Sequence, residues 1–469
     1  MHYPWWYVPA LTAPMLIALV AVLHIYVAMY AVGGGILLAA ETARAHRDDD
    51  QETLGYLKRH AWFFILVTVV YGAMTGVGIW WTIGLASPLA TEALIHIFVF
   101  GWAIEWCAFI IEVVAAFLFY YFWGRVTPQL HTQLGWIYAA SAWISLVLIT
   151  GITAFQLNPG AWPETGGFWT AFFNPQFVPQ TLARTGGALL LALLYFYLHG
   201  SFALEGQETL RRAVFARLSR WTVPAGAMII LGGLGWALFL PPSGKAIVEG
   251  TGAMNVFAGV VVAVTTIVLG LSYYGPMRRP QDVSRTLAIA LFCLGLIAIG
   301  ASEFLREATR KPFVVFDLVY GHGLYKDEVP AAQAGGLLRE GTWTRAYAKR
   351  YPGLLAADGE VNPWRLAELP AEARRDLGRT LFMYHCNDCH AERGYSGVHG
   401  LIRGWQRSDI TRVVNHPDRI HYFMPPWSGH EAETQALIEY LESITPPHPL
   451  EDRPTRQGGA RTQPSRSEG

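Results

Sequence analysis

Charged side chains are scarce in this 469-residue sequence. Asp, Glu, Lys and Arg together make up 15% of it, against about 25% in an average soluble domain. Positive and negative side chains balance at 35 each, so nothing in the net charge favours a nucleic-acid partner. The first 303 residues are strongly apolar, whereas the last 166 contain most of the acidic residues. We therefore expect a membrane domain followed by a soluble one.

Cysteine is also rare, with four in the chain. Cys107 and Cys293 each stand alone in an apolar run, and we predict that they are small buried hydrophobic side chains. Cys386 and Cys389 form the one closely spaced pair. This pattern does not indicate a disulfide framework.

The N-terminal stretch "MHYPWWYVPALTAPM" lacks Lys and Arg. A cleaved signal peptide needs a positively charged region ahead of its apolar run. We therefore expect the first apolar segment to stay in the protein as a transmembrane helix.

Long apolar runs are abundant, and eight of them could cross about 30 Å of hydrocarbon. They lie near residues 8–40, 60–83, 93–123, 132–157, 179–203, 220–241, 253–273 and 286–304. The predicted fold class is all-α, with an eight-helix transmembrane bundle over residues 1–304.

Positive residues gather in alternate loops. The loops after the first, third, fifth and seventh runs contain twelve: Arg44, Arg47, Lys58, Arg59, Arg125, Arg211, Arg212, Arg217, Arg220, Arg278, Arg279 and Arg285. The other loops and the N-terminus contain only Lys245. Since positive loops stay in the cytoplasm, we predict a bacterial inner-membrane protein whose N-terminus and C-terminal domain lie on the outer, periplasmic side.

The pentapeptide Cys386-Asn387-Asp388-Cys389-His390 is typical of covalent haem attachment. The two thiols form thioethers with the haem, and the histidine provides an axial ligand to the iron. Met424, in "YFMPPW", is the candidate sixth ligand. The alternatives are a zinc or redox site at the cysteines and an ordinary buried methionine at Met424.

The order of these features resembles class I cytochromes c. An amphipathic helix runs into the motif, and a final helix, "EAETQALIEYLESI", follows Met424. In that family the two helices cross at a glycine and aromatic contact, which the resemblance assigns to Gly378, Phe382 and Tyr440. We predict a small all-α cytochrome c domain over residues 371–447, an extracytoplasmic linker over 305–370 and a disordered tail over 448–469.

His24, Glu105 and Glu112 are ionisable residues within the predicted spans. Ionisable side chains are costly in lipid, so each is a candidate functional residue. His24 lies in the middle of the first span. Glu105 and Glu112 are seven residues apart in the third span and so share one helix face, which suits a proton path or a metal ligand. The alternative for each is a structural polar group held by hydrogen bonds.

The stretches "LHIYVAMYAVGGGILLAAET" and "GWAIEWCAFIIEVVAAFLFYYFWGRVTPQL" resemble subunit I of cytochrome bd oxidases. The likeness extends over about residues 8–315, where "REATRKPF" is similar to a family motif at the outer end of the eighth helix. The resemblance implies His24 as an axial ligand of a high-spin haem, Glu105 near that haem or ligating it, and Glu112 on a proton path.

The sequence departs from that family where electrons enter from quinol. The family's low-spin haem ligands, a His and a Met, align with Ala183 or Arg184 and with Asn255, one position from Met254. The quinol-binding loop is replaced by the short connection "LPPSGKAIVEGT". We therefore expect no quinol oxidation, and Arg184 either holds a haem propionate or seals the pocket.

A second departure concerns the eighth span. The family's glutamate ligand aligns with Gly300, and Glu303 follows about one turn later as a substitute. The cofactors implied are covalent haem c, together with haem b and, as an alternative, haem d.

Two functions remain open from the sequence. The first is an oxygen reductase-like subunit fed through its own haem c, with a second membrane subunit, O₂ as acceptor and a periplasmic electron donor. The second is a non-enzymatic subunit that relays electrons between a membrane haem b and periplasmic or membrane partners.

Overall fold

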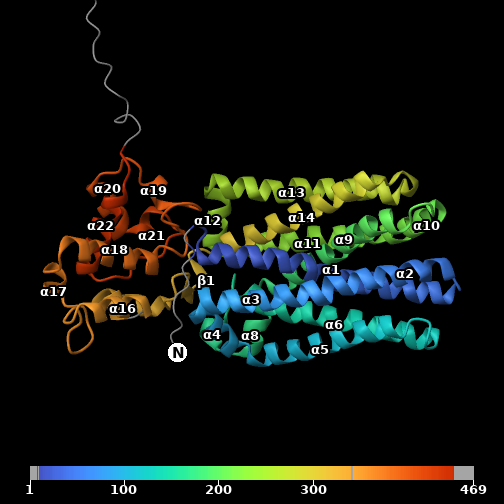
Figure 1. Ribbon diagram of the computed structural model, residues 1–469, viewed down its shortest axis with the longest axis horizontal. Helices are drawn as coiled ribbons and strands as arrows, with labels where there is room; N and C mark the ends of the chain where they lie inside the picture. Colours follow the sequence, from blue (N-terminus) through green and yellow to red (C-terminus); the bar gives the residue numbers. More distant parts are fainter. Residues whose placement is uncertain (1–7, 9, 340–341, 448–469) are drawn as a thin grey trace, which may run out of the picture.

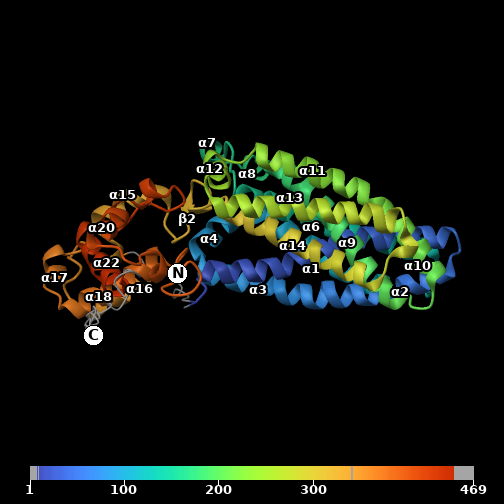
Figure 2. The same cartoon turned by 90° about the horizontal axis from the view of Figure 1, so that it is seen from above.

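The molecule is a long helical bundle with a soluble domain at one end (Figure 1). The computed structural model describes residue 8, residues 10–339 and residues 342–447. Figure 2, turned by 90°, shows the same arrangement of bundle and soluble domain. The predicted disordered tail, 448–469, lies outside the described residues.

The prediction of an all-α bundle with eight spans is confirmed. Among the described residues, eight helical segments are long and apolar enough to cross a membrane. In chain order the helices of this domain are α1 (Ala13–Arg47), α2 (Gln51–Ile65), η1 (Leu66–Tyr71), α3 (Gly72–Ala86), α4 (Pro88–Ile97), α5 (Val99–Tyr121), α6 (Pro128–Phe155), α7 (Trp162–Thr165), α8 (Phe168–Phe172), α9 (Phe177–Ala203), α10 (Glu208–Leu218), η2 (Ser219–Trp221), α11 (Thr222–Leu238), α12 (Pro242–Gly250), α13 (Gly252–Ser272), η3 (Tyr273–Met277), η4 (Pro280–Asp282) and α14 (Arg285–Ala308).

Several spans begin where the sequence provides a helix start. Thr12, Thr127 and Ser284 each accept a hydrogen bond from the backbone N–H three residues later, which satisfies one of the free donors of a first turn. The spans are helical because lipid cannot hydrogen-bond backbone groups, and a helix pairs these groups within one segment. The predicted third span, 93–123, is shorter than expected: the chain breaks at Phe98, so α4 is a separate short helix.

Helix α9 forms the centre of the bundle and α13 its edge. In the fifth span, 72% of the most apolar 18-residue stretch is buried, against 6% in the seventh. A Cβ added at Gly33 of α1 would lie 2.0 Å from the carbonyl oxygen of Ala188 in α9. Glycine at this position therefore lets the two backbones touch.

Both lone cysteines lie on the outer surface of the bundle. Cys107 and Cys293 are exposed, so the prediction that they are buried is wrong. Apolar side chains at the surface of a spanning helix face lipid rather than protein, and a hydrophobic run does not distinguish the two environments.

The soluble domain lies at the end of the bundle where α1 begins. The arginine-bearing end of α1, with Arg44 and Arg47, and helix α10 lie at the opposite end (Figure 1). The two features used to predict topology, positive loops and the haem motif, are thus at opposite ends of the molecule.

The soluble domain is larger than the segment resembling cytochrome c. Its elements are β1 (Phe313–Val315), β2 (Val319–Tyr320), η5 (Lys326–Glu328), α15 (Val329–Gly335), η6 (Leu337–Arg339), α16 (Thr342–Arg350), α17 (Pro363–Ala367), α18 (Ala371–His385), α19 (Val398–Leu401), α20 (Arg407–Asn415), α21 (Pro417–Ile420) and α22 (Glu431–Ile444). Strands β1 and β2 pair antiparallel. Residues from 313–369 share one hydrophobic core with residues from 373–441. The segment expected as a linker is therefore folded onto the C-terminal helices.

A second apolar cluster joins the two domains. Val315 and Val319, at the ends of the β1–β2 turn, pack with Phe98 and Phe155 from the ends of α5 and α6 nearest the soluble domain. The backbone N–H of Phe316 also donates to the carbonyl of Gln156 at 2.8 Å. The soluble domain is thus seated on the bundle rather than tethered to it.

Candidate functional site

The Cys386–His390 loop follows directly from a helix crossing. A Cβ added at Gly378 of α18 would lie 2.0 Å from the carbonyl oxygen of Ala436 in α22, and the rings of Phe382 and Tyr440 lie 5.9 Å apart. The crossing is therefore made at the residues that the cytochrome c resemblance indicated. Cys386 caps α18 with its N–H donating to the carbonyl of Phe382.

His390 is oriented as a metal ligand would be. Its Nδ1 lies 3.0 Å from the carbonyl oxygen of Ser396, so this nitrogen carries the proton and the Nε2 lone pair stays available. Burial lowers the pKa of His390, which favours the neutral imidazole that binds metals. With Cys386 and Cys389 beside it, the donor set fits a covalently attached haem.

Met424 lies in the loop between α21 and α22, half-buried. Two residues later, the carbonyl of Pro426 lies 3.2 Å from Nε2 of His385, the residue preceding Cys386. The methionine loop therefore passes beside the haem motif. Tyr422, two residues before Met424, donates from its hydroxyl to the carbonyl of Ala246 in α12 at 2.6 Å. This bond fastens the same loop to the membrane domain.

A buried ion pair connects the haem motif to the end of α14. Lys311 Nζ lies 3.1 Å from Asp388 Oδ2, and both side chains are mostly buried. The Asp388 carboxylate raises the pKa of Lys311, although burial of the amine opposes this rise. The loop between Cys386 and Cys389 is thus held against the last span.

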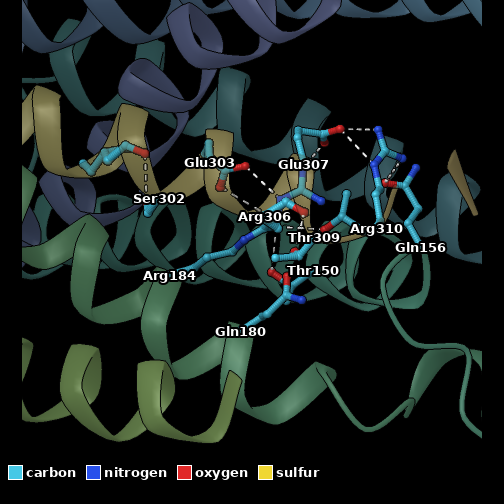
Figure 3. Close-up of polar contacts among 12 residues, drawn as sticks. Thr150, Gln156, Gln180, Arg184, Ser302, Glu303, Arg306, Glu307, Thr309 and Arg310 are labelled. Carbon is cyan, nitrogen blue, oxygen red and sulfur yellow. Dashed lines mark hydrogen bonds and ion pairs between the residues drawn. The ribbon is translucent and has the colours of Figure 1, made fainter. Parts of the chain in front are cut away.

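The C-terminal end of α14 carries a row of alternating charges (Figure 3). Arg306 contacts Glu303 at 2.9 Å and Glu307 at 2.6 Å, and Glu307 also pairs with Arg310. Arg184 of α9 lies 3.8 Å from Glu303 at the inner end of the row. Lys311 follows at the outer end, so charged groups run continuously from α9 to Asp388.

A cavity of about 220 Å³ opens beside this row. Apolar residues of α1, α9, α11, α13 and α14 form most of its wall, and its polar end is made by Gln180, Arg184, Glu303 and Arg306. Two polar atoms there, Gln180 Oε1 and Arg306 Nη1, have no hydrogen-bond partner within the described part of the chain. Buried polar atoms rarely stay unpaired, so the cavity suits a ligand with an apolar body and a polar end.

The cavity does not offer the ligand pair of a low-spin haem. Ala183 and Arg184 line it, but Met254 and Asn255 are not among its lining residues, and Asn255 donates instead to the carbonyl of Glu249. Arg184 also donates to Thr153 Oγ1 at 2.9 Å. Its guanidinium could hold a carboxylate but cannot ligate iron.

Gly300 lies against a tyrosine of α1. A Cβ at this position would come within 2.6 Å of the Tyr26 hydroxyl oxygen, which donates to the carbonyl of Leu296 at 2.9 Å. The space for a glutamate is therefore occupied. Glu303, the expected substitute, has its carboxylate engaged by Arg306 and Arg184.

His24 has one ring nitrogen fixed and the other available. Nδ1 lies 3.1 Å from Thr75 Oγ1 on α3, and that hydroxyl donates to the carbonyl of Tyr71 or Gly72. Thr75 therefore accepts the Nδ1 proton, and the Nε2 lone pair remains free for a metal. Gly76 packs beside the ring, where a Cβ would lie 3.3 Å from the imidazole.

Glu105 and Glu112 both turn toward α6. Glu105 accepts a hydrogen bond from Ser145 at 2.9 Å, and Glu112 accepts one from Tyr138 at 3.1 Å. Among the described residues neither carboxylate is hydrogen-bonded to His24, which faces α3. The carboxylates are placed along one helix face, as predicted, but next to partners that the sequence did not indicate.

The sequence interpretation missed a pair of stacked imidazoles near the haem motif. His322, in the turn after β2, stacks on His385 with ring centroids 4.2 Å apart. Neither nitrogen of His322 has a partner in the described ranges, and burial lowers the pKa of His322 to about 3. No periodic pattern could have indicated this pair, because the two residues are 63 positions apart and His322 lies in an irregular segment.

Comparison with known proteins agrees with this geometry. Residues 13–236 match the family described as cytochrome bd terminal oxidase subunit I. The bd oxidase structure from Geobacillus thermodenitrificans is similar, with 17% identity, a TM-score of 0.55, and coverage of 64% of this chain and 87% of that one. No curated protein matches. The membrane domain therefore has a bd-like fold, and its first six spans carry the family's sequence pattern.

Proposed function

We propose that this protein is a bd-type oxygen reductase-like subunit that receives electrons through its own haem c rather than from quinol. Cys386, Cys389, His390 and Met424 would hold haem c, and His24 would hold a high-spin haem b or haem d. Haem supplies a reversible one-electron iron couple and, where one axial position is open, a site for O₂.

The observation that carries this proposal is the bond from Tyr422 to Ala246 (2.6 Å). Ala246 lies in α12, in the short connection that stands where bd oxidases have their quinol loop. Tyr422 is two residues from the candidate ligand Met424. This contact supports the proposal because it joins the loop that would hold the sixth ligand of haem c to the connection that replaces the quinol loop.

The remaining residues have roles consistent with this route. Lys311 and Asp388 hold the haem motif against α14, and Arg184 and Arg306 provide cations for carboxylate groups in the adjacent cavity. Glu105 is proposed near the high-spin haem, and Glu112, with Tyr138, on a proton path. We further propose a bacterial inner-membrane location with the soluble domain in the periplasm, a second membrane subunit, and a periplasmic electron donor.

A second candidate is a relay without oxidase activity, which would pass electrons between haem c, a membrane haem b and a partner. The packing of Tyr26 against Gly300 favours it, because that contact removes the place of a glutamate ligand on α14.

Haem analysis of the purified complex distinguishes the two candidates. Pyridine haemochrome spectra together with CO-difference spectra should give one c-type signal and one CO-reactive high-spin haem. His24→Ala should remove the CO-reactive haem, and Cys389→Ser the covalent one. Haem c accompanied only by CO-silent haem would instead support the relay.

A further inference from the structure

The cavity beside Arg184 has its polar and apolar walls at different depths in the bundle. Gln180 and Arg184 lie near the start of α9. Glu303 and Arg306 lie near the end of α14, which leads into the soluble domain. Helix α10, which follows α9, lies at the far end of the bundle (Figure 1). The polar groups are therefore gathered at the end of the cavity nearest the soluble domain.

The apolar part of the cavity extends away from these groups along both helices. Leu194, which also lines it, is ten residues beyond Arg184, or about 15 Å along the axis of α9 at 1.5 Å per residue. Gly295 of α14 is another lining residue, eleven residues before Arg306, or about 17 Å at the same rise. The hydrocarbon core of a membrane is about 30 Å thick. The cavity is thus about as long as one leaflet is deep.

The cavity reaches the outside of the bundle at Gly233 of α11. This glycine is part of the cavity wall and is exposed, and a Cβ added to it would meet nothing within 4 Å. Val261 and Thr265 of α13 form another part of the wall, and α13 belongs to the least buried of the eight spans. The opening therefore gives the hydrocarbon chains of the surrounding lipid a way into the cavity.

The polar end has one positive charge in excess. The row of charges contains four cationic and three anionic side chains: Arg184, Arg306, Arg310 and Lys311, and Glu303, Glu307 and Asp388. The balance is the same within the cavity wall, where Arg184 and Arg306 accompany only Glu303 among the charged lining residues described. A head group with one negative charge would neutralise this end.

We propose that the cavity binds an anionic glycerophospholipid from the leaflet next to the soluble domain. Arg184 and Arg306 bind the phosphate, because guanidinium and phosphate groups form strong, charge-assisted hydrogen bonds. One acyl chain lies in the apolar part of the cavity, and the second stays in the surrounding lipid beside Gly233. Basic pockets between spans are suited to anionic lipid heads. This site is independent of the proposed electron route.

Gln180 favours a head that also carries a hydroxyl group. Nε2 of Gln176 donates to the carbonyl of Trp236 at 3.0 Å, so Oε1 of Gln176 is the atom that accepts from Nε2 of Gln180, at 3.5 Å. Oε1 of Gln180 is left as a buried acceptor without a partner in the described part of the chain. Buried acceptors are normally paired. Phosphatidylglycerol offers hydroxyl groups to this atom, whereas a fatty-acid carboxylate offers none.

The test counts the lipid bound to the complete complex. The complex is purified in detergent, titrated with phosphatidylglycerol, phosphatidylcholine or palmitate, and examined by native mass spectrometry. Arg184→Gln, which removes a cation, and Gly233→Leu, which adds a side chain at the opening, should each weaken binding of phosphatidylglycerol by about tenfold or more. Gly259→Leu is the matched control, because Gly259 is exposed on α13, a Cβ there meets nothing within 4 Å, and it does not belong to the described cavity wall.

Equal binding of phosphatidylglycerol by the Gly233→Leu and Gly259→Leu complexes would overturn the site. A haem b that is lost in the Gly233→Leu complex would also overturn it, since the cavity would then hold a haem. Phosphatidylcholine bound as tightly as phosphatidylglycerol would refute recognition by charge. Gln180→Leu should reduce the preference for phosphatidylglycerol over palmitate, and an unchanged preference would refute the hydroxyl contact. Because no electron donor or O₂ is added, a failure of the proposed function does not affect these outcomes.

Discussion

The amine of Lys311 lies 3.1 Å from the carboxylate of Asp388, which joins the end of the last span to the loop between the two haem-motif cysteines. Both side chains are mostly buried, so water cannot fully replace either partner of the pair. The pair fixes the distance between the haem motif and the row of charges at the C-terminal end of α14.

On the proposed electron route, Lys311→Met should slow electron transfer from haem c to the membrane haem. The aspartate loses its cation, and the motif loop is no longer held against α14, so we expect a decrease of about tenfold. Stopped-flow reduction of the membrane haem measures it. Lys326→Met is the matched control, because its pair with Asp317 is exposed. Equal rates in both variants would contradict the positioning role.

Met424→His should lower the reduction potential of the proposed haem c while the haem stays attached. A thioether ligand raises the potential relative to imidazole, and Cys386, Cys389 and His390 are untouched. Spectroelectrochemistry gives the potential, and the sulfur-to-iron absorption band should disappear. If the potential and band persist, another side chain provides the sixth ligand, and buried His322 would be the first to examine.

Gly378→Ala should destabilise the soluble domain by about 1–3 kcal/mol. Its Cβ would lie 2.0 Å from the Ala436 carbonyl, a backbone atom that cannot move aside. Gly400→Ala in α19 is the control, since a Cβ there meets nothing within 4 Å and alanine suits a helix better than glycine. Urea titration with pulse proteolysis of the full chain reports both. Equal midpoints would mean that the helices do not cross as described.

The soluble domain should lose stability as the pH rises toward 7. Burial raises the pKa of Glu433 to about 7, although three backbone N–H groups that donate to it oppose this rise. The folded chain thus holds a proton that the unfolded chain releases near its ordinary pKa of about 4.3. The stabilising contribution is complete below that value and disappears as the pH passes about 7.

Glu433→Gln should remove this pH dependence, worth at most about 4 kcal/mol by 1.36 kcal/mol per pKa unit. Glu439→Gln, on the same helix but paired with Arg374 near the surface, should keep it. Proteolysis midpoints between about pH 5 and pH 8 make the comparison. A pH-independent wild type would refute the assignment.

The membrane fold could be predicted well from the sequence because few backbone structures are stable in lipid. Eight apolar runs gave eight spans, and the boundaries differ where polar residues continue a helix, as in α10 before α11. Residues 305–370 were harder to interpret. Their core positions, such as Phe313 and Leu338, are spaced irregularly among short elements and share one core with residues of α18 and α22.

Only part of the candidate site could be predicted from the sequence, for a similar reason. Cys386, Cys389 and His390 are close in sequence, so their grouping could be predicted. Lys311 and Asp388 are 77 positions apart, and the hydrogen-bonded rings of Tyr30, His60 and His199 come from three different helices. Such contacts form when distant segments pack together, so no periodic pattern in the local sequence indicates them.

The contact between Gly300 and Tyr26 has a consequence for double substitutions. Glutamate at position 300 would collide with a phenol whose hydroxyl is already bonded to the same helix, at Leu296. The Tyr26 phenol would have to give up that bond and move, or be replaced by a smaller side chain. We therefore expect the effects of substitutions at positions 26 and 300 to be non-additive.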